Sequence, residues 1–108
     1  MTGFARGFLY WAHLDKRRPV LCVSHDARNR FAGDLIVVPC STNLRRLGWH
    51  VSLGKLEGGL PEPSVAMCEQ STTLRKDDLE PVPLGPKLSP KRMREIERAI
   101  LSALAIGV

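Results

Sequence analysis

The sequence predicts a mainly β domain that is closed by one C-terminal α-helix and folded as a small antiparallel barrel or strongly curved sheet. Two observations lead to this prediction. Short apolar or alternating runs recur between clusters of Gly, Pro and charged residues, which is typical of strands joined by turns. One stretch alone, after Ser89, repeats apolar residues at helical spacing over several turns. With 108 residues the chain has the size of one domain, and we treat 1–108 as a single domain.

Five strands follow from the apolar pattern. They are expected at 8–14, 19–24, 35–40, 49–53 and 65–70, with 71–74 as a candidate extension of the last. The second and third are almost continuously apolar, so both of their faces are expected to be buried. The fourth alternates polar and apolar residues, which is the pattern of a strand with one face in solvent.

Helical structure is expected in two places. A single turn can form at 26–31, with Asp26 as its N-cap. The final helix begins with Ser89 as its N-cap and Pro90 in the first helical position, and Gly107 is a natural stop. Basic residues crowd the first turn of this helix and oppose its dipole, which predicts either an acidic neighbour or a solvated face.

The charge balance and the cysteines restrict the functions to consider. With 16 basic and 11 acidic residues the net charge is +5, which favours an anionic partner, nucleic acid before a membrane surface. No run approaches the roughly 18 apolar residues of a membrane span, and the N-terminal apolar run is too short for a signal peptide, so we expect a cytoplasmic protein. Cys22, Cys40 and Cys68 are widely spaced, which predicts small buried side chains rather than a metal site. No cofactor is expected.

Basic and hydroxyl side chains flank the two most apolar strands. They are Lys16, Arg17 and Arg18 before the second strand, and Ser41, Thr42 and Asn43 after the third. If these strands pair antiparallel, the start of one and the end of the other meet at the same edge of the sheet. The sequence therefore predicts an anion site at this edge.

Arg18 and the hydroxyl groups are the central candidates of that site. The guanidinium of Arg18 is permanently charged, its planar fork matches phosphate oxygens, and Pro19 places it at the start of a rigid strand. The hydroxyl of Ser41 or Thr42 can hydrogen-bond a phosphoryl oxygen. Each also has a structural alternative, because Arg18 can be an ordinary surface arginine and either hydroxyl can cap a turn.

Other polar residues extend the candidate surface. His25 lies in the turn between the two apolar strands and carries an imidazole, the side chain most often used in acid–base chemistry, while Asn29 can organise that turn through its side chain. Arg45 adds charge to the polar loop 41–46. The amide of Gln70 and the hydroxyl of Thr73 are groups that can hydrogen-bond the edges of bases. They can equally well form polar pairs with side chains on a neighbouring strand.

A series of short motifs runs along nearly the whole chain. In order, they are Arg6-Gly7, Arg18-Pro19-Val20-Leu21, Ser24-x-Asp26-x-x-Asn29, Ile36-Val37-Val38-Pro39 before Ser41-Thr42-Asn43-Leu44, Gly58-Gly59-Leu60-Pro61, Glu69-Gln70, and Leu88-Ser89-Pro90 into the last helix. This series resembles the MazF/PemK (Kid) family of toxin endoribonucleases. Three features depart from the family pattern: the loop before Arg18 is short, Ser41 replaces a threonine, and Thr72 stands where an arginine is common.

The resemblance implies an SH3-like small barrel with a C-terminal helix, the CcdB/Kid/MazF toxin fold. It also implies a homodimer that cleaves single-stranded mRNA sequence-selectively and without a metal, as the toxin of a type II toxin–antitoxin system held in check by a cognate antitoxin. In that family an arginine and a threonine are catalytic, which correspond here to Arg18 and Ser41, with Thr42 as the alternative hydroxyl. The RNA 2′-hydroxyl would attack the adjacent phosphate and leave a 2′,3′-cyclic phosphate and a 5′-hydroxyl.

On this interpretation a further set of residues contacts RNA. They are Lys16, Arg17, His25, Asn29, Asn43, Arg45, Gln70 and Thr73. Two alternatives remain on the same fold. One is a CcdB-like toxin that poisons DNA gyrase without cleaving nucleic acid. The other is a catalytically degenerate relative that only binds the antitoxin.

Overall fold

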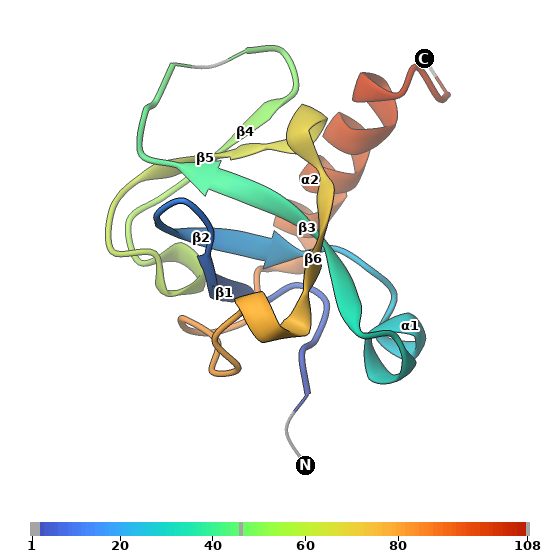
Figure 1. Ribbon diagram of the computed structural model, residues 1–108. Coiled ribbons are helices and arrows are strands. Elements are labelled where there is room, and N and C mark those ends of the chain that lie inside the picture. The colour runs from blue at the N-terminus through green and yellow to red at the C-terminus, as the bar shows by residue number, and fades with distance from the viewer. Residues whose placement is uncertain (1–2, 46, 108) are drawn as a thin grey trace.

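The protein, seen in a computed structural model that describes residues 3–45 and 47–107, is built around one strongly bent antiparallel sheet (Figure 1). Its strands are β1 (Leu9–His13), β2 (Arg17–Cys22), β3 (Asp34–Ser41), β4 (His50–Leu53), β5 (Ser64–Met67) and β6 (Thr72–Arg75). The α-helices are α1 (Asp26–Phe31) and α2 (Pro90–Ala103), and short 3-10 turns occupy Glu57–Gly59, Cys68–Gln70 and Lys76–Asp78. Residue 46 of the predicted loop 41–46 lies outside the described residues.

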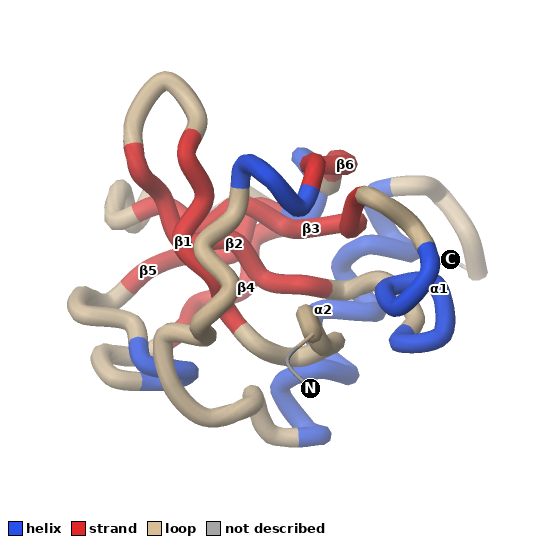
Figure 2. Tube along the Cα trace, turned by 60° about the horizontal axis from the view of Figure 1, so that its bottom comes forward, coloured by secondary structure: helices blue, strands red, loops and turns tan. Residues whose placement is uncertain are grey.

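The long central strand β3 holds the sheet together. The strands follow the order β1-β2-β3-β5-β4, and β6 also pairs with β3. The first half of β3, from Asp34 to Val37, pairs with β6, whereas its last two residues, Cys40 and Ser41, pair with β5. Because β3 exchanges partners along its length, the sheet bends into a barrel-like shape, with β1 and β2 side by side in Figure 2.

Two hydrophobic clusters fill the two sides of the sheet. Alternation along β2 sends Val20 and Cys22 into one cluster and Leu21 into the other. Helix α2 covers the Leu21 side, where Met93 and Ile96 of its apolar stripe are buried. A fully buried side chain of this size contributes about 1.5–3 kcal/mol to the free energy of unfolding, so the helix and sheet stabilise each other.

The predicted fold class is confirmed: a mainly β fold with one C-terminal helix. The predicted cysteines are also confirmed as free and buried, and burial raises the pKa of both Cys40 and Cys68 to about 12. No helix in the part of the chain that the structure describes is long and apolar enough to cross a membrane.

Three details of the predicted elements were wrong. The last helix ends at Ala103, before the Gly107 that was expected to stop it. The expected strand 65–70 ends at Met67, because the chain turns through Cys68–Gln70 before a separate strand, β6, begins. The N-cap of α1 is His25 rather than Asp26, since the backbone N–H of Ala27 donates to the His25 Nδ1 atom at 3.0 Å.

Candidate active site

Arg18 and Ser41 come from neighbouring strands and meet at one edge of the sheet. The last pair in the β2–β3 register is Val20 with Pro39, and continuing that register by two residues places Arg18 opposite Ser41. Residues opposite each other on antiparallel strands project from the same face. Both line one surface groove of about 300 Å³, so the predicted anion site at this edge has a physical cavity.

The two arginines of the hairpin have different surroundings. Arg17 donates from Nε and Nη2 to the carboxylate of Glu80 at 2.7 and 2.9 Å, and its guanidinium lies 4.2 Å from the centre of the Trp11 ring. These hydrogen bonds hold the pKa of Glu80 below its usual value and raise that of Arg17. Arg18 has no carboxylate partner among residues 3–45 and 47–107. Its half-buried guanidinium therefore remains available for an anion.

The hydroxyl of Ser41 is oriented by the loop that follows it. The backbone N–H of Asn43 donates to the Ser41 Oγ atom at 3.1 Å, and the N–H of Arg45 donates to the Asn43 Oδ1 atom at 3.2 Å. Ser41 is thus an acceptor toward the protein, and its own proton is left to donate to a ligand. Thr42 lines the same groove but is exposed, and it does not share the position opposite Arg18.

Two further charged residues line this groove. Lys16 sits in the turn of the β1–β2 hairpin, at the mouth of the groove. Glu62, which follows Pro61, is the single carboxylate among the described lining residues, and it has no ion-pair partner among them. Sequence reasoning missed Glu62, because the distance along the chain between it and Arg18 hides their proximity.

Asn43 and Arg45 lie beside the groove rather than within it. Together with Ser41 and His50 they line a second, smaller cavity of about 160 Å³. Since Ser41 borders both cavities, a ligand bound at Arg18 can continue into the second one. The structure thus brings these two predicted residues close to the central pair.

A partly buried His50–Glu69 pair was also missed by sequence reasoning. The His50 Nε2 atom lies 3.0 Å from the Glu69 Oε2 atom, while the N–H of Leu47 donates to the His50 Nδ1 atom at 3.3 Å. Burial acts to raise the pKa of Glu69, but the hydrogen bond with His50 and smaller contributions outweigh it, so the pKa is lowered. The pair fixes the loop before β4. The alternating pattern of 49–53 placed His50 near solvent, because sequence does not show which loop covers a strand.

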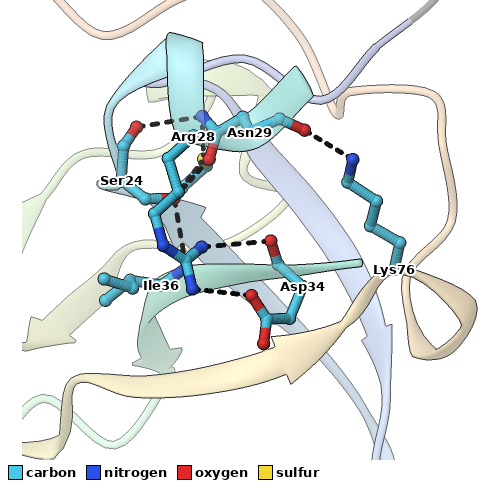
Figure 3. A network of polar contacts seen from close by, with 7 residues as sticks. Ser24, Arg28, Asn29, Asp34, Ile36 and Lys76 are labelled. Atoms are coloured by element: carbon cyan, nitrogen blue, oxygen red, sulfur yellow. Dashed lines mark hydrogen bonds and ion pairs between the residues drawn. The ribbon is translucent and has the colours of Figure 1, made fainter. Parts of the chain in front are cut away.

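His25 and Asn29 lie elsewhere, beyond the other end of β2, and Figure 3 shows the polar contacts of Asn29 with Ser24 and Lys76. Asn29 is 1% exposed; its Nδ2 atom donates to the backbone oxygen of Ser24 at 2.9 Å, and the Ser24 hydroxyl donates back to its Oδ1 atom. Lys76 donates to the Asn29 backbone oxygen. His25 caps α1. The structure therefore does not bring these two residues to Arg18, and it leaves Asn29 no surface with which to contact RNA.

Gln70 and Thr73 occupy exposed positions on another part of the β3 surface. Gln70 ends the turn before β6, and Thr73 pairs with Ile36 near the middle of β3. Neither residue lines the groove that holds Arg18. As for metal ligands, residues 3–45 and 47–107 contain no group of three or more His, Cys, Asp or Glu side chains suited to hold an ion.

The fold and the groove define a small, bent β-barrel protein with a basic, hydroxyl-bearing site at the ends of two adjacent strands. Residues 5–104 match the family described as PemK-like, MazF-like toxin of type II toxin–antitoxin system. Endoribonuclease MazF1 of Mycobacterium bovis is 32% identical over 107 residues, which cover 98% of this chain and 97% of that protein. The chain therefore belongs to the PemK/MazF toxin family.

Solved structures agree with this assignment. The Mycobacterium tuberculosis toxin MazF-mt6 superposes with a TM-score of 0.84 at 28% identity, covering 94% of this chain and 99% of that one. An endoribonuclease in complex with its cognate antitoxin, from a mycobacterial species, has a TM-score of 0.84 at 30% identity and covers 97% and 98%. The predicted MazF/PemK resemblance is confirmed.

Proposed function

We propose that this chain is the toxin of a type II toxin–antitoxin system and acts as a sequence-selective, metal-independent endoribonuclease on single-stranded mRNA. One observation carries the proposal. Arg18, which is free of carboxylate partners among the described residues, lies opposite the hydroxyl of Ser41 in a single groove. This pair provides a fixed charge and a hydrogen-bond donor for one phosphate. The family match favours this function over a CcdB-like gyrase poison.

The mechanism begins with attack of the RNA 2′-hydroxyl oxygen on the adjacent phosphorus. The bond from phosphorus to the 5′-oxygen breaks, which leaves a 2′,3′-cyclic phosphate and a 5′-hydroxyl. Arg18 stabilises the charge that grows on the phosphoryl oxygens, and Ser41 donates a hydrogen bond to one of them. The pKa of a guanidinium is too high for it to act as an efficient base, so Arg18 acts mainly through its charge.

Glu62 is the group in the groove that can accept the proton of the attacking hydroxyl. A carboxylate is a competent general base, and Glu62 is not engaged in an ion pair with any described residue. We assign the protonation of the leaving 5′-oxygen to the ammonium of Lys16 or to water, because Lys16 lines the same groove. Glu62 thereby removes the proton of the attacking hydroxyl within the groove, and Lys16 or water returns a proton to the leaving oxygen.

RNA would extend from this centre over the neighbouring loop. Lys16, Thr42, Asn43 and Arg45 line the groove or the adjoining cavity and are proposed as direct contacts. Gln70 and Thr73 are exposed, and they remain proposed contacts for more distant nucleotides. Arg17, His25 and Asn29 receive structural roles instead, because an ion pair, a helix cap and a buried network occupy their polar groups.

The proposed partners are a cognate antitoxin and a second copy of the chain. A related endoribonuclease is described in complex with its cognate antitoxin, which supports the first. Exposed apolar side chains near the end of α2, at Leu101, Leu104 and Ile106, offer surface for such contacts. We place the protein in the cytoplasm, where its mRNA substrate would be found.

The test is cleavage of a long single-stranded RNA in excess chelator. The wild type should cut and should leave 2′,3′-cyclic phosphate and 5′-hydroxyl ends, whereas Arg18→Ala should cut at least about 10²-fold more slowly. Arg94→Ala is the matched control, because Arg94 is an exposed arginine of α2 that is not among the residues lining the groove. A 5′-phosphate product, or equal cleavage by Arg18→Ala, would contradict the mechanism.

A further inference from the structure

A further cavity, larger than the groove around Arg18, lies beside α1 beyond the other end of β2. Its volume is about 590 Å³, which falls in the range of about 300–1,000 Å³ where proteins bind small molecules. The described residues that line it do not line the groove around Arg18. Three segments of the chain form its walls: Gly3, Phe4 and Ala5 before β1, Asp26, Asn29 and Arg30 of α1, and Lys76 and Pro81 after β6.

Contacts within the chain hold the walls of this cavity in place. The backbone N–H of Ala5 donates to the Tyr10 hydroxyl at 2.8 Å, and the Phe4 ring packs edge-on against the Tyr10 ring with 4.9 Å between the centroids. The ammonium of Lys76 donates to the Asn29 backbone oxygen, which ties the segment after β6 to α1 (Figure 3). The cavity is therefore preformed, and a ligand need order little of the protein when it binds.

The polar groups that remain available in the cavity belong mostly to cations. Neither Arg30 nor Lys76 forms an ion pair with a carboxylate among residues 3–45 and 47–107. An ammonium has three N–H groups, so the bond to the Asn29 oxygen leaves Lys76 donors to spare. The exposed guanidinium of Arg30 stands at the rim with its planar set of donors.

The carboxylate of Asp26 is already engaged by the protein. Its Oδ1 atom accepts the backbone N–H of Arg6 at 2.8 Å, and this hydrogen bond is the main cause that lowers the pKa of Asp26. One engaged carboxylate thus faces two cations without carboxylate partners. The balance of charge in the cavity favours an anionic group on the ligand.

The rest of the wall is apolar. The partly buried ring of Phe4, the methyl group of Ala5 and the ring of Pro81 provide surface on which a flat apolar group can pack. A ligand that combined a flat apolar body with one anionic group would use both kinds of wall.

We propose that this cavity is a second ligand site, which binds a small organic anion made of a planar apolar body and a carboxylate or phosphate group. The anionic group accepts hydrogen bonds from Arg30 and Lys76, and the planar body packs against Phe4. Because such a ligand touches three segments of the folded chain, its binding stabilises the fold. The site shares no described lining residue with the proposed nuclease groove.

The test is isothermal titration calorimetry of the full-length protein with naphthoate and naphthyl phosphate as probes. At least one should bind with a Kd of about 1 mM or tighter, and should raise the Tm. The tighter of the two identifies the anionic group that the site prefers. Uncharged naphthol and the cation naphthylmethylamine should bind at least about tenfold more weakly, because neither carries an anion for the two cations.

Variants at Arg30 locate the binding. Arg30→Gln removes one cation from an exposed position, so the fold should be kept, and affinity for the anionic probe should fall about tenfold. Arg30→Glu should weaken binding further. Arg94→Gln makes the same change of net charge on α2, outside the cavity, and should leave the affinity unchanged. Arg18→Ala should also leave it unchanged, which separates this site from the nuclease groove.

Three results would overturn the inference. They are no binding of either anionic probe, equal binding of naphthol, and a loss of affinity in Arg18→Ala or Arg94→Gln that matches the loss in Arg30→Gln. RNA cleavage by Arg30→Gln should equal that of the wild type. Since probe binding is measured without RNA, this test and the test of the proposed nuclease activity can fail independently.

Discussion

Arg17 and Glu80 are joined by two parallel hydrogen bonds, from Nε at 2.7 Å and from Nη2 at 2.9 Å, across the groove edge where Arg18 stands free. Glu80 also contacts His13 at 2.9 Å, so one carboxylate ties together both strands of the hairpin. The two adjacent arginines therefore have different roles, one structural and one proposed to be catalytic. Arg17 holds the hairpin against the connector after β6, and Arg18 faces the site.

The first prediction separates these two arginines. Arg18→Ala should lower kcat/KM for RNA cleavage by about 10²–10³-fold, because it removes the charge that stabilises the transition state. Arg17→Ala should cost much less, since Glu80 already neutralises that guanidinium. Steady-state cleavage of a fluorogenic RNA measures both. Equal losses for the two variants would show that the division of roles is wrong.

The second prediction concerns the proposed general base. Glu62→Gln should lower kcat by about 10²–10⁴-fold, the usual contribution of acid–base catalysis, without raising KM. Loss of a negative charge from a basic groove should, if anything, tighten RNA binding. Glu62→Asp, which keeps a carboxylate, should recover part of the rate. An unchanged kcat for Glu62→Gln would contradict its role as the general base.

The third prediction concerns the buried network of Figure 3. Asn29→Asp should lower the free energy of unfolding by about 2–4 kcal/mol, because a carboxylate cannot donate to the Ser24 backbone oxygen and would be buried beside it. Denaturant titration measures this loss. Affinity of the folded protein for RNA should be unchanged. A loss of RNA affinity without a loss of stability would show that Asn29 contacts RNA.

The fourth prediction concerns the ion pair that anchors the start of α2. Arg92 donates from Nε and Nη2 to the Glu57 carboxylate at 2.6 and 3.0 Å, so for Arg92 the first of the two alternatives, an acidic neighbour rather than a solvated face, is found. Burial acts to raise the pKa of Glu57, but hydrogen bonds from Arg92 and Gly54 outweigh it, and the pKa is lowered. Glu57→Gln should lower the free energy of unfolding by about 1–2 kcal/mol at neutral pH.

The sign of its pH dependence follows from the lowered pKa. The charged pair contributes fully above the carboxyl pKa of the unfolded chain, which is about 4.3, and this contribution is lost as the pH falls through the lower value of the folded state. The stability difference between wild type and Glu57→Gln should therefore be largest near neutral pH and shrink in acid. A difference that grows on acidification would contradict the assigned pair.

Local sequence signals predicted most of the fold. Ser89 and Pro90 start α2 as expected, because capping is decided by a few adjacent residues. The strand expected at 65–70 was too long, since its end is decided by β3, which pairs with Val65 and Ala66 of β5 on one stretch and with β6 on another. Such a change of partner depends on distant contacts that no local pattern records.

The sequence predicted the candidate-site residues that lie at the ends of paired strands. It did not predict those whose position depends on how distant segments pack. Arg18 and Ser41 follow from the pairing of two apolar strands. Glu62 reaches the groove from a loop, and His50 reaches the adjoining cavity from the start of β4; the positions of both are set by tertiary packing. Asn29 shows the converse, because a polar residue in a turn was expected at the surface but satisfies its hydrogen bonds in the core.

The most direct test of joint action on one phosphate is a double-mutant cycle on kcat/KM with Arg18→Ala, Ser41→Ala and the combined variant. Each single substitution should lower kcat/KM by about 10²–10³-fold. The double variant should be little less active than the less active single variant, because the effects of groups that act on the same transition state are strongly non-additive. Losses that multiply, or a single variant with wild-type activity, would contradict a shared scissile phosphate.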